Sequence, residues 1–314
     1  MGLSEFELIE RYFSSGTIRR EDVLVGIGDD AALLQVLPKH DIVSAMKTLV
    51  EGVHFERGAK PQALGHRVLA IALSRLAATG ATPAWVTLSL ALPAADAAWL
   101  ARFSAAFTAL AQRYQVQLVG GDTVCGPLSI TVVASGFVPR GQALQRGGAR
   151  AGDLIYVTGT LGEAGLALLA ERGAVHLPQK LRAKFRARLD QPQPRVAEAL
   201  ALRHLATAAI DLPNGLEQGL GELVDASAVG ATLYLRELPL LPETTAWLPA
   251  AGGPKFALHA GGDYELCLTI PAKHQAAAEA AFSTLDCGCT WIGMVETTPG
   301  LRCVLEDGSL NTLR

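Results

Sequence analysis

The stretch Gly26-Ile27-Gly28-Asp29-Asp30-Ala31 ends a short apolar run, 23–27, and opens a loop that carries two adjacent carboxylates. Its letters match the glycine-rich fingerprint of dinucleotide-binding folds, but two carboxylates would repel a pyrophosphate unless a cation intervenes. A glycine-flanked acidic pair at a strand end suits a metal ion that carries a phosphate. The alternative is an ordinary Asp-rich turn. The stretch therefore favours an α/β domain with a metal-phosphate loop over an NAD-binding oxidoreductase.

The bulk properties of the chain limit its class. It has 314 residues and a net charge of −3. This length is large for a single hydrophobic core and sufficient for two domains. No apolar run is long enough to cross a bilayer, and the acidic start of the chain does not resemble a signal peptide. Five cysteines suit a reducing cytoplasm better than a disulfide framework. Without a basic block, neither nucleic acid nor a membrane is an expected partner.

Hydrophobic periodicity predicts alternating helices and strands on both sides of a Gly- and Arg-rich stretch, 139–153. Before this stretch we expect helices at 5–13, 61–78 and 96–114, and strands at 23–27, 41–50, 86–92, 116–119 and 128–138. After it we expect helices at 163–171, 194–206, 216–227 and 272–285, and strands at 154–157, 209–212, 264–270 and 291–295. The pattern indicates an α/β (α+β) fold of two domains, 1–140 and 150–314.

Three more loops carry polar residues next to apolar runs. Gly120-Gly121-Asp122-Thr123, between two predicted strands, offers backbone N–H groups to a phosphate and a carboxylate to a cation. Asp211, before Pro213-Asn214-Gly215, has a similar position, as has the stretch from Ala260 to Glu265. The alternative for each is a tight turn with a solvated side chain. There is no GxxxxGK[ST] motif, so a P-loop ATPase is disfavoured.

Taken in order, the motifs of the chain resemble those of the thiamine-monophosphate kinase family. The resemblance extends from the N-terminus to about Val295, and several motifs in the right order are more specific than any one of them. It is carried by Gly26-Ile27-Gly28-Asp29-Asp30-Ala31, Thr48-Leu49-Val50-Glu51-Gly52-Val53-His54-Phe55, Gly80-Ala81-Thr82-Pro83-Ala84-Trp85, Gly120-Gly121-Asp122-Thr123, Val157-Thr158-Gly159-Thr160-Leu161-Gly162 and Asp263-Tyr264-Glu265-Leu266-Cys267.

The resemblance implies an aminoimidazole ribonucleotide synthetase-like fold and a cytoplasmic homodimer built mainly by the N-terminal domains. It also implies ATP and Mg²⁺ as cofactors and thiamine phosphate as substrate. The implied residues are Gly121, Asp122 and Arg146 for ATP, His54 for the substrate, and Asp30, Asp122 and Asp211 for the metal. It identifies no catalytic side chain.

The departures from the family pattern concentrate on the metal and substrate positions. Family hydroxyl and carboxyl groups are replaced by Ala45, Met46, Lys47, Arg75, Pro213, Asn214 and Gly262. Magnesium takes oxygen ligands, whereas Lys and Arg offer only donors and repel the ion. The changes make the site about six charges more positive than the family pattern, and bound cations are normally offset by carboxylates.

Two functional hypotheses follow from these replacements. The first is an impaired or inactive thiamine-phosphate kinase, and the alternative is a non-catalytic dimeric nucleotide-binding or scaffold protein of the same fold. We also expect Lys47 or Arg75 to form an ion pair with Asp30, Asp122 or Asp211, in place of the metal, with Arg75 favoured because its fork bridges two carboxylates.

Overall fold

The computed structural model describes residues 5–14 and 18–313. By internal contacts the chain divides into two compact units. The N-terminal unit comprises Met1–Leu76 and Ala81–Gly141, and the C-terminal unit comprises Ala77–Gly80 and Gln142–Arg314. Both units mix helices and sheet, so the predicted two-domain α/β (α+β) class is confirmed. Among the described residues, no helix has the length and apolar character needed to span a membrane.

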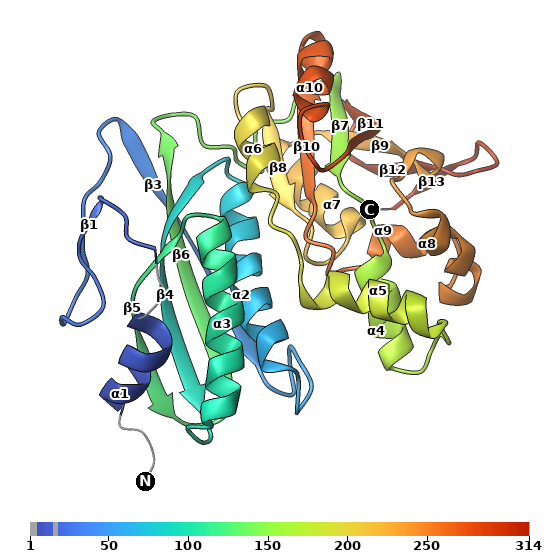
Figure 1. Cartoon of the computed structure of the whole chain (residues 1–314). Helices are drawn as coiled ribbons and strands as arrows, with labels where there is room; N and C mark the ends of the chain where they lie inside the picture. Colours follow the sequence, from blue (N-terminus) through green and yellow to red (C-terminus); the bar gives the residue numbers. More distant parts are fainter. Residues whose placement is uncertain (1–4, 15–17, 314) are drawn as a thin grey trace. The chain divides into compact units, whose positions relative to one another are not determined.

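The N-terminal unit is built on a four-stranded sheet in the order β3-β6-β4-β5. Its β4 and β5 are parallel, and the other neighbours are antiparallel. Two long helices, α2 and α3, lie along one face of the sheet (Figure 1). The bounds are β3 His40–Val50, α2 Pro61–Ala77, β4 Thr82–Leu92, α3 Ala97–Arg113, β5 Gln117–Cys125 and β6 Ser129–Pro139, preceded by α1 Glu5–Ile9, a π-helical turn Glu10–Ser14, β1 Val23–Val25 and β2 Leu33–Leu34.

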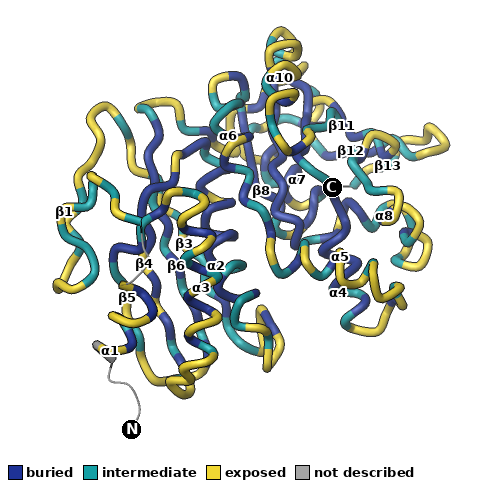
Figure 2. The backbone as a smooth tube through the Cα atoms, viewed as in Figure 1, coloured by how far each residue is buried: buried dark blue, intermediate teal, exposed yellow. Residues whose placement is uncertain are grey.

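Close backbone packing fixes the two helices on the sheet. The Asp96 carboxylate caps α3 by accepting from the backbone N–H groups of Ala98, at 2.8 Å, and Trp99, at 3.1 Å. A Cβ on Gly65 of α2 would lie 2.3 Å from the carbonyl oxygen of Phe103 on α3, so only glycine permits this approach. The buried core runs along these helices and along β4 and β6 (Figure 2).

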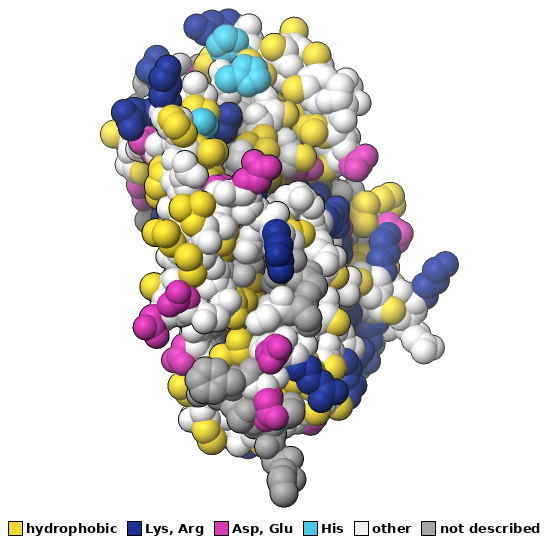
Figure 3. Space-filling view, turned by 60° about the vertical axis from the view of Figure 1, so that its left-hand side comes forward, with side chains coloured by type: hydrophobic (Ala, Val, Ile, Leu, Met, Phe, Trp, Pro, Cys, Tyr) yellow, Lys and Arg dark blue, Asp and Glu magenta, His cyan; other side chains and the backbone are white. Residues whose placement is uncertain are grey.

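The opposite face of the N-terminal sheet is open. On it Ile42, Met46 and Val124 are 49%, 56% and 48% exposed. Figure 3 shows hydrophobic side chains interspersed with charged ones on one side of the molecule. Exposed apolar side chains that share one sheet face are typical of a surface covered by a partner.

The prediction of a loop at Gly120 to Thr123 was wrong, because β5 continues through these residues to Cys125. Parallel pairing with β4 joins Gly121 to Leu88 and Asp122 to Ser89. A Cβ on Gly121 would lie 1.9 Å from the Leu88 carbonyl oxygen. Gly121 therefore serves strand packing here, rather than a turn.

The C-terminal unit contains a seven-stranded sheet in the order β13-β12-β9-β11-β7-β10-β8, in which only β12 and β9 are parallel. Its strands are β7 Asp153–Thr158, β8 Ala208–Asp211, β9 Gly230–Tyr234, β10 Leu266–Pro271, β11 Cys289–Glu296, β12 Gly300–Val304 and β13 Leu310–Thr312. Its α-helices are α4 Glu163–Glu171, α5 Gln179–Asp190, α6 Val196–Leu202, α7 Leu216–Ser227, α8 Pro242–Trp247, α9 Phe256–His259 and α10 Gln275–Phe282.

The predicted helices at 163–171 and 216–227 match α4 and α7, whereas α5 was missed. The sequence of α5, QKLRAKFRARLD, is charged over most of its surface and buries only Phe185 and Leu189. Two apolar contacts in twelve residues give a weak periodic signal.

Candidate active-site cavity

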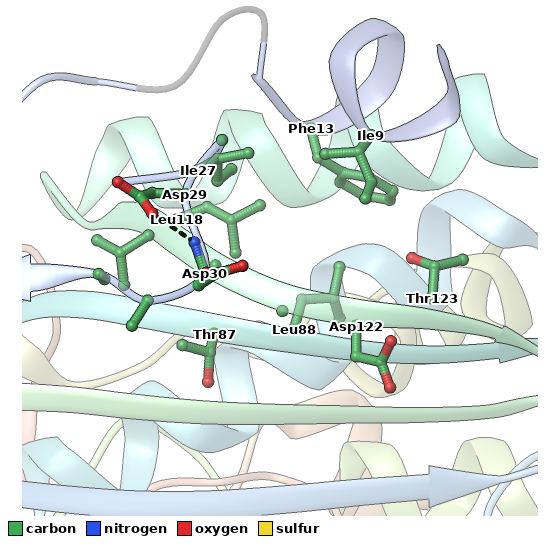
Figure 4. Close-up of a pocket in the computed structure, with 16 residues that line it drawn as sticks. Ile9, Phe13, Ile27, Asp29, Asp30, Thr87, Leu88, Leu118, Asp122 and Thr123 are labelled. Carbon is green, nitrogen blue, oxygen red and sulfur yellow. Dashed lines mark hydrogen bonds between the residues drawn. The ribbon is translucent and has the colours of Figure 1, made fainter. Parts of the chain in front are cut away.

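A cavity of about 550 Å³ lies entirely within the N-terminal unit, between the π-helical turn, the Gly-Asp-Asp loop and β5 (Figure 4). It contains three of the residues that the sequence analysis selected: Asp30, Gly121 and Asp122. Its lining residues are Ile9, Phe13, Ile27, Gly28, Asp29, Asp30, Ala31, Ala32, Thr87, Leu88, Leu118, Val119, Gly120, Gly121, Asp122 and Thr123. The apolar wall formed by Ile9 and Phe13 was not predicted as part of the site, since the sequence showed these residues only as one face of a helix.

The Gly-Asp-Asp loop holds its second carboxylate open to the cavity. The Asp29 carboxylate accepts from the backbone N–H of Asp30 at 2.7 Å, and Gly28 has a φ of +114°, which favours glycine. Asp30 is exposed, as is Asp122 on β5. The structure records no ion pair for either side chain among the described residues. Two exposed carboxylates on one cavity suit a cation or a hydrogen-bond donor from a ligand.

Strand register separates these acids from Lys47. Lys47 on β3 pairs with Val132 on β6. The same row of paired residues continues across the sheet to Leu88 on β4 and Gly121 on β5. Asp122 belongs to the next row, so its side chain lies on the opposite face of the sheet from that of Lys47. This arrangement explains why Lys47 does not occupy the cavity of Asp122.

The guanidinium of Arg75 points to backbone instead of a carboxylate. Arg75, on α2, donates from Nη1 to the Met46 carbonyl oxygen at 2.6 Å. The prediction that Arg75 pairs with an acid of the site was therefore wrong. The physical reason is that β3 is an edge strand, and Arg75 satisfies one of its outward carbonyl groups.

His54 lies in the exposed loop after β3. Its Nδ1 is 3.1 Å from the backbone N–H of Val50, which donates to it. Burial lowers the pKa of His54, and the positive charges of Lys47 and Arg67 lower it further. The lowered pKa keeps the ring neutral near pH 7.

The remaining candidates lie in the C-terminal unit, where four of them gather at the end of two strands. Asp211 is the last residue of β8, and it pairs with Leu266, the first residue of β10. The N–H of Gly262 donates to the carbonyl oxygen of Pro213 at 2.9 Å, and a Cβ on Gly261 would lie 3.1 Å from the Cα of Asn214. Gly262 has a φ of +96°, a conformation that strains any residue with a side chain.

Arg146 stands apart from that group, within the same unit. Its Nη1 forms an ion pair with Glu222 at 2.8 Å, and its side chain is 56% exposed. The contact leaves donors of the guanidinium available, since the group has five N–H bonds.

A buried charged network in the C-terminal unit was not predicted. The fully buried carboxylate of Glu265 accepts from Arg188 at 2.7 Å, from Arg195 at 2.6 Å to each oxygen, and from Thr158 at 2.7 Å. The two arginines lie 77 and 70 positions from Glu265, so no local spacing could reveal the contact. The motif Asp263-Tyr264-Glu265 was the only sequence signal.

The residues present do not fit a magnesium cluster. At the positions that the resemblance gives to metal ligands, Ala45 has no oxygen in its side chain, and Lys47 and Arg75 carry positive charge. The described part of the chain contains no group of three or more His, Cys, Asp or Glu side chains placed to hold a metal ion. Asp29, Asp30 and Asp122 are the carboxylates that line the N-terminal cavity, and Asp29 accepts a hydrogen bond from the backbone N–H of Asp30. A multi-metal phosphate site uses more carboxylates than these.

Two family models match the chain. The model described as AIR synthase related protein, N-terminal domain, matches residues 28–138, and that described as AIR synthase related protein, C-terminal domain, matches residues 150–306. The chain therefore has the two-domain architecture of AIR synthase related proteins.

Individual relatives narrow this class. Thiamine-monophosphate kinase of Escherichia coli (strain K12) is 43% identical, and the match covers 100% of this chain and 97% of the relative. The crystal structure of thiamine-monophosphate kinase from Stenotrophomonas maltophilia K279a has a TM-score of 0.89 at 41% identity, covering 98% of each chain. The structure of AaThiL complexed with AMPPCP and TMP has a TM-score of 0.75 at 28% identity, covering 98% and 94%. The chain belongs to the thiamine-monophosphate kinase family.

Proposed function

We propose that this chain binds ATP and thiamine monophosphate and has lost most or all of its phosphoryl transfer. The binding half rests on membership of the kinase family and on the relative complexed with AMPPCP and TMP. The loss rests on one observation, that Arg75 is held on the Met46 carbonyl oxygen at 2.6 Å, together with the resemblance, which gives the positions of Lys47 and Arg75 to metal ligands. A cation fixed there opposes the entry of a divalent ion.

Phosphoryl transfer asks the protein mainly to position its reactants and to neutralise charge on the transferred group, and magnesium normally supplies much of both. Lys47 and Arg75 neutralise charge without ligating the metal that bridges the phosphates. We therefore expect binding to survive better than turnover.

Within this proposal, the residual site residues have separate roles. Gly121 and Asp122 would contact ATP on the N-terminal cavity, and Asp30 would share a cation with Asp122. In the C-terminal unit, Arg146 would contact phosphate, and Asp211 would supply a further carboxylate. His54 would contact the substrate, with a neutral ring.

A homodimer is part of the same proposal. The open sheet face with the exposed side chains of Ile42, Met46 and Val124 supports an interface between N-terminal units. Light scattering at micromolar concentration tests it, and a stable monomer would remove this part of the proposal.

The test of function is direct detection of thiamine diphosphate from ATP, thiamine phosphate and magnesium. We expect turnover at least about 10³-fold below a typical enzyme, because lost metal contacts remove several kcal/mol of charge stabilisation. Robust turnover by the unmodified chain would refute the proposed impairment. Binding of AMPPCP without turnover would favour the non-catalytic nucleotide-binding protein.

Restoring the ligands provides the complementary experiment. Lys47→Asp, Arg75→Asp, Pro213→Ser and Asn214→Asp together should recover measurable activity, whereas single changes should do little, because such ligands act as a unit. Gly262→Glu is left out of this set. Its φ of +96° and the 3.1 Å approach of a Cβ to the Ala164 Cβ make a side chain there strained.

A further inference from the structure

A second cavity, of about 400 Å³, lies within the C-terminal unit, where α4 and α5 lie side by side (Figure 1). Its lining includes Thr160 and Glu163 at the start of α4, and Lys184, Ala187 and Arg188 on α5. Glu163 is 1% exposed, whereas Lys184 and Ala187 are exposed. The buried and half-buried members therefore form the base of this α4–α5 cavity, and the exposed ones form its rim.

Glu163 and Arg188 each have one polar atom without a hydrogen bond. The Thr160 hydroxyl donates to Glu163 Oε1 at 2.6 Å, while Oε2 is buried and has no hydrogen-bond partner among the described residues. Arg188 Nη2 donates to Glu265 at 2.7 Å, while its Nε is buried and likewise lacks a hydrogen bond within the described structure. Nε lies 4.0 Å from Glu163 Oε1, too far for a hydrogen bond. Such buried atoms cost free energy unless a ligand or a water satisfies them.

A buried acceptor beside a buried donor fits a ligand edge that carries a donor beside an acceptor. The edge of a 4-aminopyrimidine ring has this pattern, because its exocyclic amino group donates and the adjacent ring nitrogen accepts. Glu163 Oε2 would accept from the amino group, and Arg188 Nε would donate to the ring nitrogen. Both protein groups are charged, which makes such hydrogen bonds stronger than neutral ones.

The size of the cavity favours an organic ligand over water alone. A water molecule takes up about 30 Å³ in the liquid, so a cavity of about 400 Å³ has room for a ring as well. Small-molecule sites usually have volumes of about 300–1,000 Å³. Because Glu163 Oε2 and Arg188 Nε are covered, a ligand reaches them only after the exposed side chains of the rim adjust.

We propose that the α4–α5 cavity binds a 4-aminopyrimidine ring, which Glu163 and Arg188 recognise by its amino group and ring nitrogen. The inference deepens the proposed function and rests on it for the two sources of the ring, since thiamine phosphate and the adenine of ATP both contain one. In this role the two residues determine which ring is bound and take no part in phosphoryl transfer.

Calorimetric titration in EDTA compares two matched pairs of probes: thiamine with oxythiamine, and ATP with inosine triphosphate. In each pair an oxo group replaces the amino group and the adjacent ring nitrogen gains a proton, so donor and acceptor exchange places. We expect the amino form of at least one pair to bind about tenfold more tightly, and that pair identifies the source of the ring. Equal binding within both pairs would overturn the proposal.

Three variants test whether this preference arises in the α4–α5 cavity. Ala187→Phe places a ring in the cavity and should weaken the preferred ligand at least about tenfold, because the two rings compete for the same volume. Ala183→Phe, one turn earlier on α5, is the matched control, since Ala183 is exposed and outside the lining. Glu163→Gln should reduce the preference to about threefold or less, because an amide can donate as well as accept. Circular dichroism and thermal unfolding check that each variant is folded.

Unchanged affinity in Ala187→Phe, equal losses in Ala187→Phe and Ala183→Phe, or an undiminished preference in Glu163→Gln would each overturn the proposal. These failures leave the proposed function intact, because the ligands would still bind elsewhere on the chain. Robust kinase turnover would instead refute the impairment, and it would not affect a preference measured in EDTA, where no turnover takes place.

Discussion

The two units handle buried and exposed charge in opposite ways. In the C-terminal unit, the Glu265 carboxylate is 0% exposed and receives hydrogen bonds from two arginines and a threonine. In the N-terminal unit, the carboxylates of Asp30 and Asp122 are exposed on a cavity of about 550 Å³. Arg75, in the same unit, donates a hydrogen bond to a backbone carbonyl group.

The difference distinguishes two kinds of charged group: those that stabilise the fold, such as Glu265, and those whose exposed position suits ligand binding, such as Asp30 and Asp122. A buried carboxylate must be fully hydrogen-bonded, because its desolvation is otherwise uncompensated. Exposed acids and cations keep much of their hydration, so they can stay without protein partners at little cost. Loss of the buried Glu265 carboxylate should therefore cost far more stability than loss of an exposed carboxylate.

Glu265→Gln should destabilise the protein by about 3–5 kcal/mol, because it removes the buried carboxylate that pairs with the half-buried guanidinium groups of Arg188 and Arg195. The measurement is the free energy of unfolding from urea denaturation. Glu296→Gln is the matched control, since Glu296 pairs with Arg302 at 2.6 Å but is 41% exposed. It should cost about 1 kcal/mol or less. Similar costs for the two variants would break the comparison.

Gly121→Ala should destabilise by at least about 2 kcal/mol, since overpacking of this severity forces backbone shifts. A Cβ there would lie 1.9 Å from the Leu88 carbonyl oxygen, whereas a Cβ on Gly120 would have no atom within 4 Å. Gly120→Ala is therefore the adjacent control and should be nearly neutral. Thermal unfolding of both variants decides whether strand packing positions Asp122. A tolerated Gly121→Ala would show that β5 can shift freely.

Local patterns predicted α4 and α7 well because each buries a broad apolar stripe, as in Leu216, Leu220 and Leu223 of α7. The same local signals failed at Gly121, where the glycine meets a neighbouring strand instead of a turn. Contacts between residues far apart in the sequence could not be predicted from local patterns either. The guanidinium group of Arg195, for example, donates to Glu265, which lies 70 positions away in the sequence. The motifs did indicate Asp30 and Asp122, since both follow apolar runs in the sequence. The hydrogen bond of Arg75 could not be predicted in this way, because it depends on a carbonyl group at the exposed edge of β3.

Asp263 is a second buried carboxylate of the C-terminal unit, and its stability contribution should depend on pH. Burial is the largest cause that raises its pKa from 3.8 to about 7, opposed by hydrogen bonds from the N–H groups of Gly162 and Ala164. Between these two pKa values the folded state holds a proton that the unfolded state has lost. The free energy of unfolding should therefore fall as pH rises from about 4 to 7, by at most about 1.4 kcal/mol per pH unit.

Urea unfolding of Asp263→Asn at several pH values isolates this contribution, because other groups titrate in both proteins. The variant is expected to be less stable at low pH, since its amide presents an NH₂ group to one of the two backbone donors. Its stability should nevertheless lack the fall seen in the parent. Parallel pH profiles for parent and variant would show that Asp263 is ionised in the fold throughout this range.

The smallest effect should come from the acids of the N-terminal cavity. Asp30→Asn and Asp122→Asn should each change the free energy of unfolding by no more than about 0.5 kcal/mol, the usual range for exposed side chains without partners. Neither carboxylate has an ion pair recorded among the described residues, and both line the same cavity, so loss of one charge should relieve slight repulsion. Added salt should shrink the difference between parent and variants, because it screens exposed charges. Urea unfolding at low and high salt measures both effects. A loss near that of Glu265→Gln in either variant would mean that these acids stabilise the fold, and the division between the two units would then fail.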